Sequence, residues 1–304
     1  MIQNHSNGFC LRASVNVRRF FFLPASLILL LCSIFVSCAS LPQQSPEALS
    51  AAQEKLSLES SYIPSRFEWS PLCRGIDTFR FEDTDIPLVY HVVRIDLSEP
   101  SLSLACVKGS VPSAVKKTSA IVAFNATQFE SKFFVFNRLK GVFRMDGEEI
   151  GMPVEKYCAL LFDSSLANGA CGGGFRASIV ESQTEEALLG WKNAVGGFFV
   201  VLKDGVPCQF KVQSLRARVG VGLTEDAKTM YVLVVEENKS CGLSYGHCAL
   251  LFKALGCKDA MEFDGGHSTA LYVGGKSVLL GYPWRSSLNA IVVLSDCSLG
   301  KGME

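Results

Sequence analysis

The chemically active side chains concentrate in residues 261–270, which read MEFDGGHSTA. Glu262 and Asp264 are two positions apart, and side chains alternate between the faces of a strand, so a strand here would point both acids to one face. Gly265 and Gly266 follow, and two glycines let the backbone turn sharply and approach a ligand closely. The segment therefore predicts either an acid–base or cation site, or an ordinary hairpin whose aspartate is solvated.

His267 and Ser268 extend this group of polar side chains. A histidine titrates near neutral pH and could donate a proton to a leaving phosphate, although it could equally be a plain turn residue. Ser268 is better suited to hydrogen-bond Asp264 or a phosphate than to act as a nucleophile, because no base is supplied for it nearby. Residues 266–270 come close to the G-x-S-x-G elbow of α/β-hydrolases, which needs a following helix and a later histidine. Residues 269–273 read as a strand and no histidine follows His267, so this alternative is rejected.

The elements that must position these residues are mostly strands. One helix is expected over residues 245–255, where apolar side chains share a face and Gly256 ends the pattern. Because helices are few and late, the predicted class is α+β, with a large mixed β-sheet core. The β-branched and apolar runs predict strands at 88–97, 102–107, 121–124, 142–145, 151–154, 159–162, 198–202, 219–223, 230–235, 261–264, 269–273, 277–280 and 290–294.

Three segments of different character divide the chain. Residues 1–37 are expected to be a signal peptide, because arginines precede an apolar run that is short and interrupted for a membrane span. The run ends in Phe-Val-Ser-Cys, which resembles a bacterial lipoprotein signal with Cys38 as the lipidated residue; a signal anchor or an ordinary secretory peptide are the alternatives. Residues 38–70 are expected to be a tether with a short helix near 46–60, and residues 71–304 the folded domain.

Composition excludes several classes of protein. Apolar residues make up 48% and charged residues 19%, which is inconsistent with a disordered chain. The 29 basic and 29 acidic residues balance, so no global charge attracts nucleic acid. The 12 cysteines contain no C-x-x-C pair, and the four histidines are too few to suggest a Cys/His zinc site. Cysteines within apolar runs are expected to be small core residues.

Separated segments between residues 86 and 294 resemble the phosphodiester glycosidase family. The resemblance rests on VVRID at 92–96 with PSLSL at 100–104, AFNATQF at 123–129, the glycine turns at 195–205, RVGVG at 218–222, and residues 255–268. The family has Asn-Gly-Gly-Phe-Phe where this chain has Asn125 followed by Ala126 and Thr127. His267 replaces the third glycine of an Asp-Gly-Gly-Gly-Ser pattern, and Glu262 stands at an asparagine-like position. These departures affect the site more than the fold.

The resemblance implies hydrolysis of a sugar-1-phosphodiester, at the bond between the anomeric carbon and a phosphate oxygen. The implied catalytic residues are Asp264, Arg218, Glu262 and His267. Asp264 would be the general acid or base, or would hold a divalent cation such as Ca²⁺. Arg218 offers a planar fork of donors that suits two phosphodiester oxygens, although it could also be a plain surface residue of a strand. Glu262 would be the second carboxylate that glycoside cleavage usually requires.

The implied substrate-binding residues are Asn125, Gly197, Gly265, Gly266 and Ser268. Asn125 could hydrogen-bond sugar hydroxyls, orient Asp264, or simply form a turn. The expected partners are a carbohydrate phosphodiester of envelope glycans or glycolipids and a membrane reached through the lipid anchor, with no nucleic acid. The expected location is the bacterial cell envelope. The alternative is a non-catalytic polysaccharide-binding lipoprotein on the same fold, in which Ala126 and Thr127, in place of the two glycines of the family, abolish catalysis.

Overall fold

The computed structural model describes residues 62–132, 136–164, 174–237, 240–280 and 287–295. All of them belong to one compact unit, Ser45–Glu304. The predicted signal peptide, Cys38 and the helix expected near 46–60 lie outside the described residues. No helix in the described part of the chain is long and apolar enough to cross a membrane.

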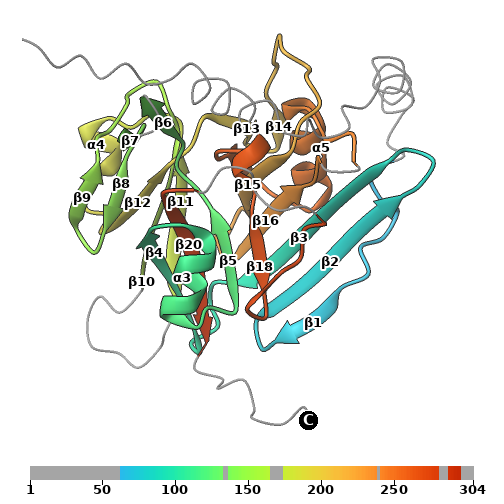
Figure 1. Ribbon diagram of the computed structural model, residues 1–304, viewed down its shortest axis with the longest axis horizontal. Helices are drawn as coiled ribbons and strands as arrows, with labels where there is room; N and C mark the ends of the chain where they lie inside the picture. Colours follow the sequence, from blue (N-terminus) through green and yellow to red (C-terminus); the bar gives the residue numbers. More distant parts are fainter. Residues whose placement is uncertain (1–61, 133–135, 165–173, 238–239, 281–286, 296–304) are drawn as a thin grey trace, which may run out of the picture. The chain divides into compact units, whose positions relative to one another are not determined.

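The main element is an eight-stranded sheet, called here the large sheet (Figure 1). In spatial order it contains β1 (Ser70–Cys73), β2 (Ile76–Asp83), β3 (Leu88–Asp96), β16 (Thr229–Val235), β15 (Arg218–Leu223), β17 (Asp259–Glu262), β13 (Phe199–Lys203) and β14 (Val206–Pro207). Its central strands are apolar, and each is joined to its neighbours by antiparallel hydrogen bonds. The predicted hairpin of 219–223 with 230–235 is confirmed as β15 and β16.

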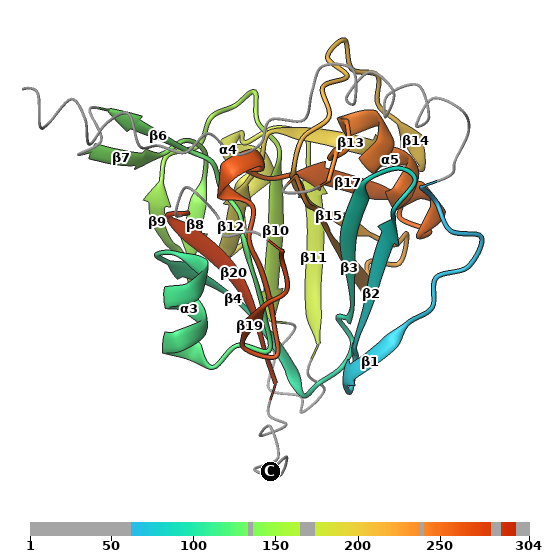
Figure 2. The same cartoon turned by 45° about the vertical axis from the view of Figure 1, so that its right-hand side comes forward.

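Two five-stranded sheets and one hairpin complete the β structure. The first five-stranded sheet contains β11 (Phe175–Val180), β10 (Ala159–Ser164), β12 (Asn193–Gly196), β8 (Phe143–Met145) and β9 (Glu148–Gly151). The second contains β19 (Lys276–Ser277), β18 (Leu271–Val273), β5 (Val122–Asn125), β20 (Asn289–Ser295) and β4 (Leu102–Lys108). The hairpin consists of β6 (Phe129–Lys132) and β7 (Phe136–Leu139), and Figure 2 shows it extending away from the sheets.

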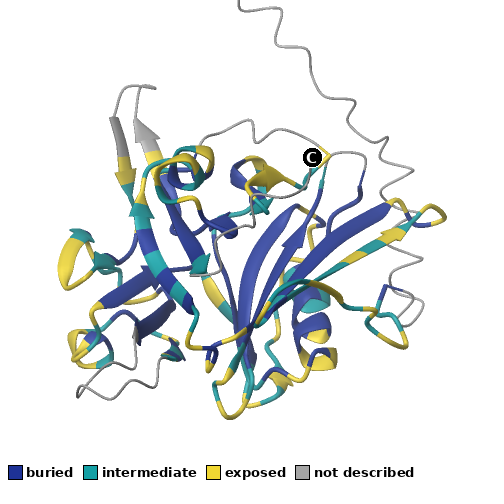
Figure 3. Ribbon diagram, turned by 90° about the horizontal axis from the view of Figure 1, so that it is seen from below, coloured by how far each residue is buried: buried dark blue, intermediate teal, exposed yellow. Residues whose placement is uncertain are grey.

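One apolar cluster is shared by the three sheets. It combines Val221 of the large sheet, Leu160 of the first five-stranded sheet and Phe124 of the second. Figure 3 shows buried residues following the strands and exposed residues gathering in the turns. Cys106 and Cys158 are buried free thiols within this cluster, as expected for cysteines in apolar runs. The sheets are therefore held together by a common core rather than by separate ones.

Helix α5 (Tyr245–Ala254) covers the other face of the large sheet. Ser244 and His247 form a reciprocal capping box at its start, in which each side chain bonds the backbone of the other. Gly222 of β15 makes room for the helix, because a Cβ there would lie 2.7 Å from Phe252 and 2.6 Å from the sulfur of Cys257. The predicted helix over 245–255 is confirmed.

The α+β class with a β-rich core and few helices is also confirmed. The described strand pairs are all antiparallel and are divided among four sheets, which differs from a single large mixed sheet. Short turns account for hairpins such as β15–β16, because antiparallel neighbours need only a turn whereas parallel neighbours need a long crossover, but pairs such as β3–β16 join strands distant in the chain. Two short helices that the sequence analysis did not predict are present, α3 (Val111–Thr118) and α4 (Glu185–Leu188).

Candidate functional site

The loop after β17 connects the large sheet with the second five-stranded sheet. Strand β17 ends at Glu262 and β18 begins at Leu271, and the 3-10 turn η1 (Gly266–Ser268) lies between them. Because β17 ends at Glu262, Asp264 lies in the loop rather than in the strand. The prediction that both acids share a face of one strand is therefore wrong. Asp264 is half-buried and His267 is exposed in this loop, whereas Ser268 is buried.

The two glycines of the loop lie against the start of β15. A Cβ on Gly265 would come within 2.6 Å of the Ala217 carbonyl oxygen and 3.4 Å of the Arg218 Cα. Gly266 has a φ of +56° and donates its N–H to the same carbonyl oxygen at 2.9 Å. Gly265 and Gly266 therefore bring the Asp264 loop next to Arg218 through close backbone packing. The Gly266 N–H is committed to the chain itself, and the predicted contact of Gly265 and Gly266 with substrate remains a prediction.

Asn125 holds both ends of this loop. Its Nδ2 donates to the Asp264 carbonyl oxygen at 2.6 Å, and its Oδ1 accepts from the Ala270 N–H at 2.8 Å. The residue is fully buried at the end of β5. Both polar atoms of the amide are in use, so this geometry supports the positioning of Asp264 rather than direct contact with a sugar.

Glu262 is a buried carboxyl group on the face of the large sheet that α5 covers. It lies two residues after Ala260, which packs in the α5 cluster, and opposite Gly220 of β15. Neither carboxyl oxygen has a hydrogen bond of normal geometry. Burial raises the pKa of Glu262 to about 7, even though the nearby guanidinium of Arg218 and the thiol of Cys248 act to lower it. A fraction of the molecules therefore carry a neutral Glu262 at physiological pH.

Arg218 is buried at the first position of β15. Its Nε donates to the Leu243 carbonyl oxygen at 3.0 Å and its Nη2 to the Ser214 carbonyl oxygen at 2.8 Å. Its guanidinium carbon lies 3.8 Å from the ring centre of Tyr245. The edge formed by Nε and Nη2 is thus occupied by main-chain carbonyls, and the predicted phosphate contact of Arg218 remains a prediction. A phosphodiester would have to bind the Nη1 side.

Aromatic side chains that the sequence analysis did not single out surround this pair. Tyr245 lies 5.1 Å from Phe210 and 5.5 Å from Phe199 between ring centres. Phe199 is the cross-strand partner of Glu262, and its side chain is 42% exposed. The two phenylalanines that follow the Gly-Gly turn at 196–197, the second of which is Phe199, are the signal in the sequence that could have pointed to these aromatic residues.

Gly197 permits close packing beneath Glu262. A Cβ at this position would lie 2.5 Å from the Glu262 carbonyl oxygen and 2.3 Å from the end of Met261. Its own N–H donates to the Cys158 carbonyl oxygen at 2.9 Å. The structure therefore places Gly197 next to the site as a packing residue, and its predicted contact with substrate remains a prediction.

The predicted cation is the remaining element of the site. Nowhere in the described ranges do three or more His, Cys, Asp or Glu side chains gather as metal ligands would. Divalent calcium takes six to eight oxygen ligands, usually with several carboxylates. The donor set near Asp264 in the described part of the chain thus does not fit such an ion on these side chains alone.

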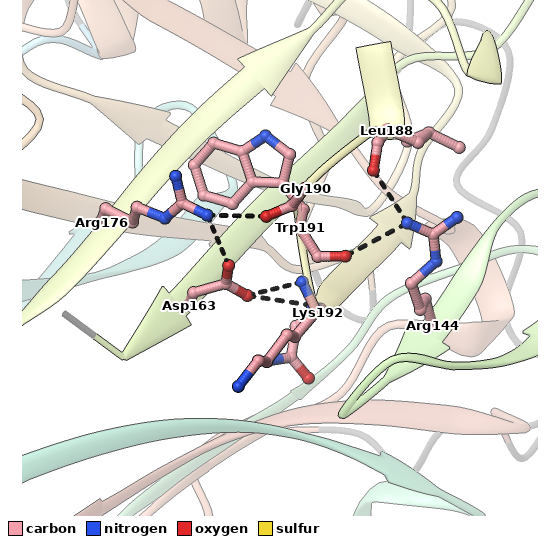
Figure 4. A network of polar contacts seen from close by, with 8 residues as sticks. Arg144, Asp163, Arg176, Leu188, Gly190, Trp191 and Lys192 are labelled. Atoms are coloured by element: carbon pink, nitrogen blue, oxygen red, sulfur yellow. Dashed lines mark hydrogen bonds and ion pairs between the residues drawn. The ribbon is translucent and has the colours of Figure 1, made fainter. Parts of the chain in front are cut away.

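A polar cluster elsewhere shows what a purely structural network looks like in this protein (Figure 4). In the first five-stranded sheet, Asp163 accepts from Arg176 and from the backbone of residues 192 and 193. Arg176 also donates to the Gly190 carbonyl oxygen and stacks 4.1 Å from the centre of Trp191. Both carboxyl oxygens of Asp163 have partners, in contrast to those of Glu262.

The titration of Glu262 yields a stability prediction. Between about pH 4.5 and pH 7 the folded protein binds more protons at this residue than the unfolded chain, so its stability falls as the pH rises through that window. Glu262→Gln removes the ionisation. As the pH rises from about 4.5 to about 8, we expect the free energy of unfolding of the variant to increase by roughly 3 kcal/mol relative to that of the wild type, at about 1.4 kcal/mol per pKa unit. Urea unfolding at both pH values measures this, and a constant difference between the two proteins would contradict it.

The acidic loop between β17 and β18, with the buried side chains of Glu262 and Arg218 beside it, defines an α+β protein with a polar site where two antiparallel sheets are connected. The chain belongs to the phosphodiester glycosidase family, whose sequence profile matches residues 137–294, more than half of the chain. Asn125 and its neighbours precede the matched range. No curated protein matches the chain in sequence.

Solved structures share this fold at low sequence identity. A hypothetical protein from Synechocystis is 14% identical with a TM-score of 0.58; the match covers 76% of this chain and 64% of that one. The catalytic domain of zebrafish N-acetylglucosamine-1-phosphodiester alpha-N-acetylglucosaminidase, auto-inhibited by its pro-peptide, is 14% identical with a TM-score of 0.52, covering 77% and 85%. A candidate exported protein from Burkholderia pseudomallei is 13% identical with a TM-score of 0.50, covering 68% and 74%. At these identities the similarity establishes the fold.

Proposed function

We propose that this protein hydrolyses a sugar-1-phosphodiester, releasing the free sugar and a phosphomonoester. Membership of the phosphodiester glycosidase family supports the reaction class. The observation that carries the proposal is the packing of the Asp264 loop against the start of β15, because it brings the backbone of a half-buried acid next to that of the buried Arg218, whose charge is felt by the buried Glu262. This combination suits a substrate that has a sugar on one side and an anionic phosphate on the other.

The reaction breaks the bond between the anomeric carbon and the bridging phosphate oxygen. Water adds to the anomeric carbon, and the electron pair of the broken bond leaves with the phosphate. Because a phosphomonoester is a fairly good leaving group, stabilising the positive charge on the sugar matters more than protonating the leaving oxygen. Asp264 is the residue we assign to that stabilisation or to activating the water. Arg218 stabilises the phosphate, while Glu262 balances the charge of Arg218 in the buried site.

The alternative of a non-catalytic polysaccharide-binding protein loses its main support. It rested on the side chains of Ala126 and Thr127, which stand where the family has glycines. Ala126 is fully buried in the shared core, and the Thr127 hydroxyl donates to the Val142 carbonyl oxygen at 3.3 Å. These side chains are accommodated inside the protein, so they do not by themselves argue against catalysis.

The proposed setting is the bacterial cell envelope, with teichoic-type, capsular or glycolipid phosphodiesters as substrates and Cys38 as a lipidated anchor. The arginine-led apolar run followed by Cys38 supports this placement. The fold relatives from zebrafish and Burkholderia are described as a pro-peptide-bearing domain and a candidate exported protein, respectively.

The direct test uses methyl phosphodiesters of N-acetylglucosamine 1-phosphate in both anomeric forms. We expect the purified protein to release reducing sugar and methyl phosphate in equal amounts from one anomer. The release of phosphate-bearing sugar would instead show cleavage on the other side of phosphorus and would contradict the proposal. A panel of glucose and galactose diesters then defines the sugar, and saturable binding without turnover on the whole panel would favour the binding-protein alternative.

A further inference from the structure

Unpartnered buried polar atoms are concentrated at one place in the described part of the chain. Apart from Glu262, the residues that carry them are Gln128, Thr269 and Ser287, whose side-chain oxygens have no hydrogen-bond partner. These three residues are between 3% and 7% exposed. A buried polar group without a partner costs about 1–3 kcal/mol, and native proteins contain few of them. Three at one location therefore require an explanation.

The three residues lie at the same end of three neighbouring strands. Thr269 lies two residues before β18, Gln128 lies between β5 and β6, and Ser287 lies two residues before β20. Strand β5 pairs antiparallel with both β18 and β20, so the start of β18, the end of β5 and the start of β20 meet at one edge. The Asp264 loop enters β18 at this same edge.

The amide of Gln128 has a defined orientation. Its Nε2 faces the Gly197 carbonyl oxygen at 3.5 Å, a long hydrogen bond. Because that carbonyl can only accept, the amino group must face it, and Oε1 is the atom left without a donor. Phe198, the residue after Gly197, donates its N–H to the Glu262 carbonyl oxygen at 2.8 Å. Gln128 is thus linked through Gly197 and Phe198 to the end of β17.

The free atoms specify the chemistry of a ligand. The Oε1 of Gln128 accepts only, whereas the hydroxyls of Thr269 and Ser287 can donate or accept. A phosphodiester anion has only acceptor atoms and cannot satisfy Gln128. Sugar hydroxyls both donate and accept at short spacing, so they match the donor and acceptor chemistry of all three residues.

We propose that Gln128, Thr269 and Ser287 form the subsite that binds the hydroxyl groups of the sugar ring. This proposal rests on the proposed function and adds an orientation to it. The sugar lies against the end of β5, and the phosphate lies on the side of Arg218. The half-buried Asp264 loop, which spans from one group to the other, then faces the bond between sugar and phosphate.

Gln183 provides a matched control, because it is a buried glutamine whose amide is satisfied. Its Oε1 accepts from the N–H groups of Val142 and Val154 at 2.8 Å each, and its Nε2 donates to the Cys158 carbonyl oxygen at 2.7 Å. Removing such an amide leaves the N–H groups of Val142 and Val154 without partners, while the Cys158 carbonyl oxygen keeps the Gly197 N–H. Removing the Gln128 amide eliminates an unpartnered oxygen at the loss of one long hydrogen bond.

The experiment compares Gln128→Leu, Thr269→Val and Gln183→Leu in the full-length protein without ligand and with sugars. We expect Gln183→Leu to lower the melting temperature clearly, and Gln128→Leu to leave it unchanged or raise it. Binding of N-acetylglucosamine, glucose, galactose and mannose is measured by calorimetry. For the sugar that binds best, we expect Gln128→Leu to weaken affinity at least about 10-fold and Thr269→Val several-fold.

The outcomes separate this proposal from the proposed function. A Gln128→Leu variant that melts as low as Gln183→Leu would show a structural amide, satisfied by ordered water, and would overturn the subsite. Unchanged sugar affinity in that variant, or no binding of any of the four sugars to the wild type, would also overturn it. Diester hydrolysis by the wild type with an unchanged KM in Gln128→Leu would leave the enzyme assignment standing and remove the subsite. Sugar binding that depends on Gln128, without hydrolysis of any diester, would support the subsite and contradict the enzyme assignment.

Discussion

Asp264→Asn is expected to lower kcat/KM on a sugar-1-phosphodiester by roughly 10²- to 10⁴-fold, the range typical for loss of a catalytic acid or base. Asparagine keeps the size and hydrogen-bonding shape of the side chain, but it carries no negative charge to stabilise a cationic sugar or to accept a proton from water. The loop itself should persist, because Asn125 holds it through the main-chain atoms of Asp264 and Ala270 rather than through the carboxylate. Ligand binding should therefore remain measurable. The effect is measured from initial rates on the methyl diester anomer that the wild type hydrolyses.

Asp259→Asn is the matched control for this substitution. Asp259 is the first residue of β17, and its carboxylate accepts from the Asp204 N–H at 3.1 Å and lies 3.5 Å from the Lys203 amino group. It is at the far end of the strand from the loop, so we expect activity close to that of the wild type. If Asp264→Asn retained the wild-type rate, or if Asp259→Asn lost as much activity, Asp264 could not be the acid of the reaction.

The fold could be predicted from sequence where the local pattern and the final packing agree. The strands of the β15–β16 hairpin are continuous apolar runs, which is typical of strands buried on both faces. Helix α5 has both a capping residue and a glycine beyond its end. Helix α3 was missed because the Val111–Thr118 segment is short and has only two fully buried residues, Val111 and Ala114. The pairing of strands among several sheets was also not predictable, since partners such as β17 and β15 are distant in the chain.

The site was predictable in its residues and less so in their roles. The Asp-Gly-Gly turn and Arg218 were found because short motifs carry them, and the structure places their backbones in contact. The use of the Arg218 fork by two main-chain carbonyls could not be seen, because residues 214 and 243 are linked to it only by the fold. Gln128 gave no signal, because a single polar residue becomes informative only when its burial and its missing partner are known.

The second large effect concerns Arg218. We expect Arg218→Lys to lower kcat/KM about 10²-fold, equivalent to roughly 2.7 kcal/mol of transition-state stabilisation. Lysine keeps the charge, but a single ammonium cannot reach both the Leu243 and Ser214 carbonyls and still present a donor to the phosphate. It also cannot stack on Tyr245 as the planar guanidinium does. The positive charge at residue 218 is therefore no longer held in a fixed position in the Arg218→Lys variant.

Arg176→Lys separates a loss of catalysis from a loss of arginine packing. Arg176 also donates to a main-chain carbonyl and stacks on an aromatic ring, at 4.1 Å from the centre of Trp191, but it belongs to the first five-stranded sheet. Both variants should lose some thermal stability, since each removes a stacked guanidinium and its hydrogen bonds. Only Arg218→Lys should lose activity on the diester, and its loss should be smaller on an uncharged aryl glycoside that has no phosphate. Equal activity losses in the two variants, or full activity of Arg218→Lys on the diester, would contradict a phosphate contact and leave Arg218 as a packing residue.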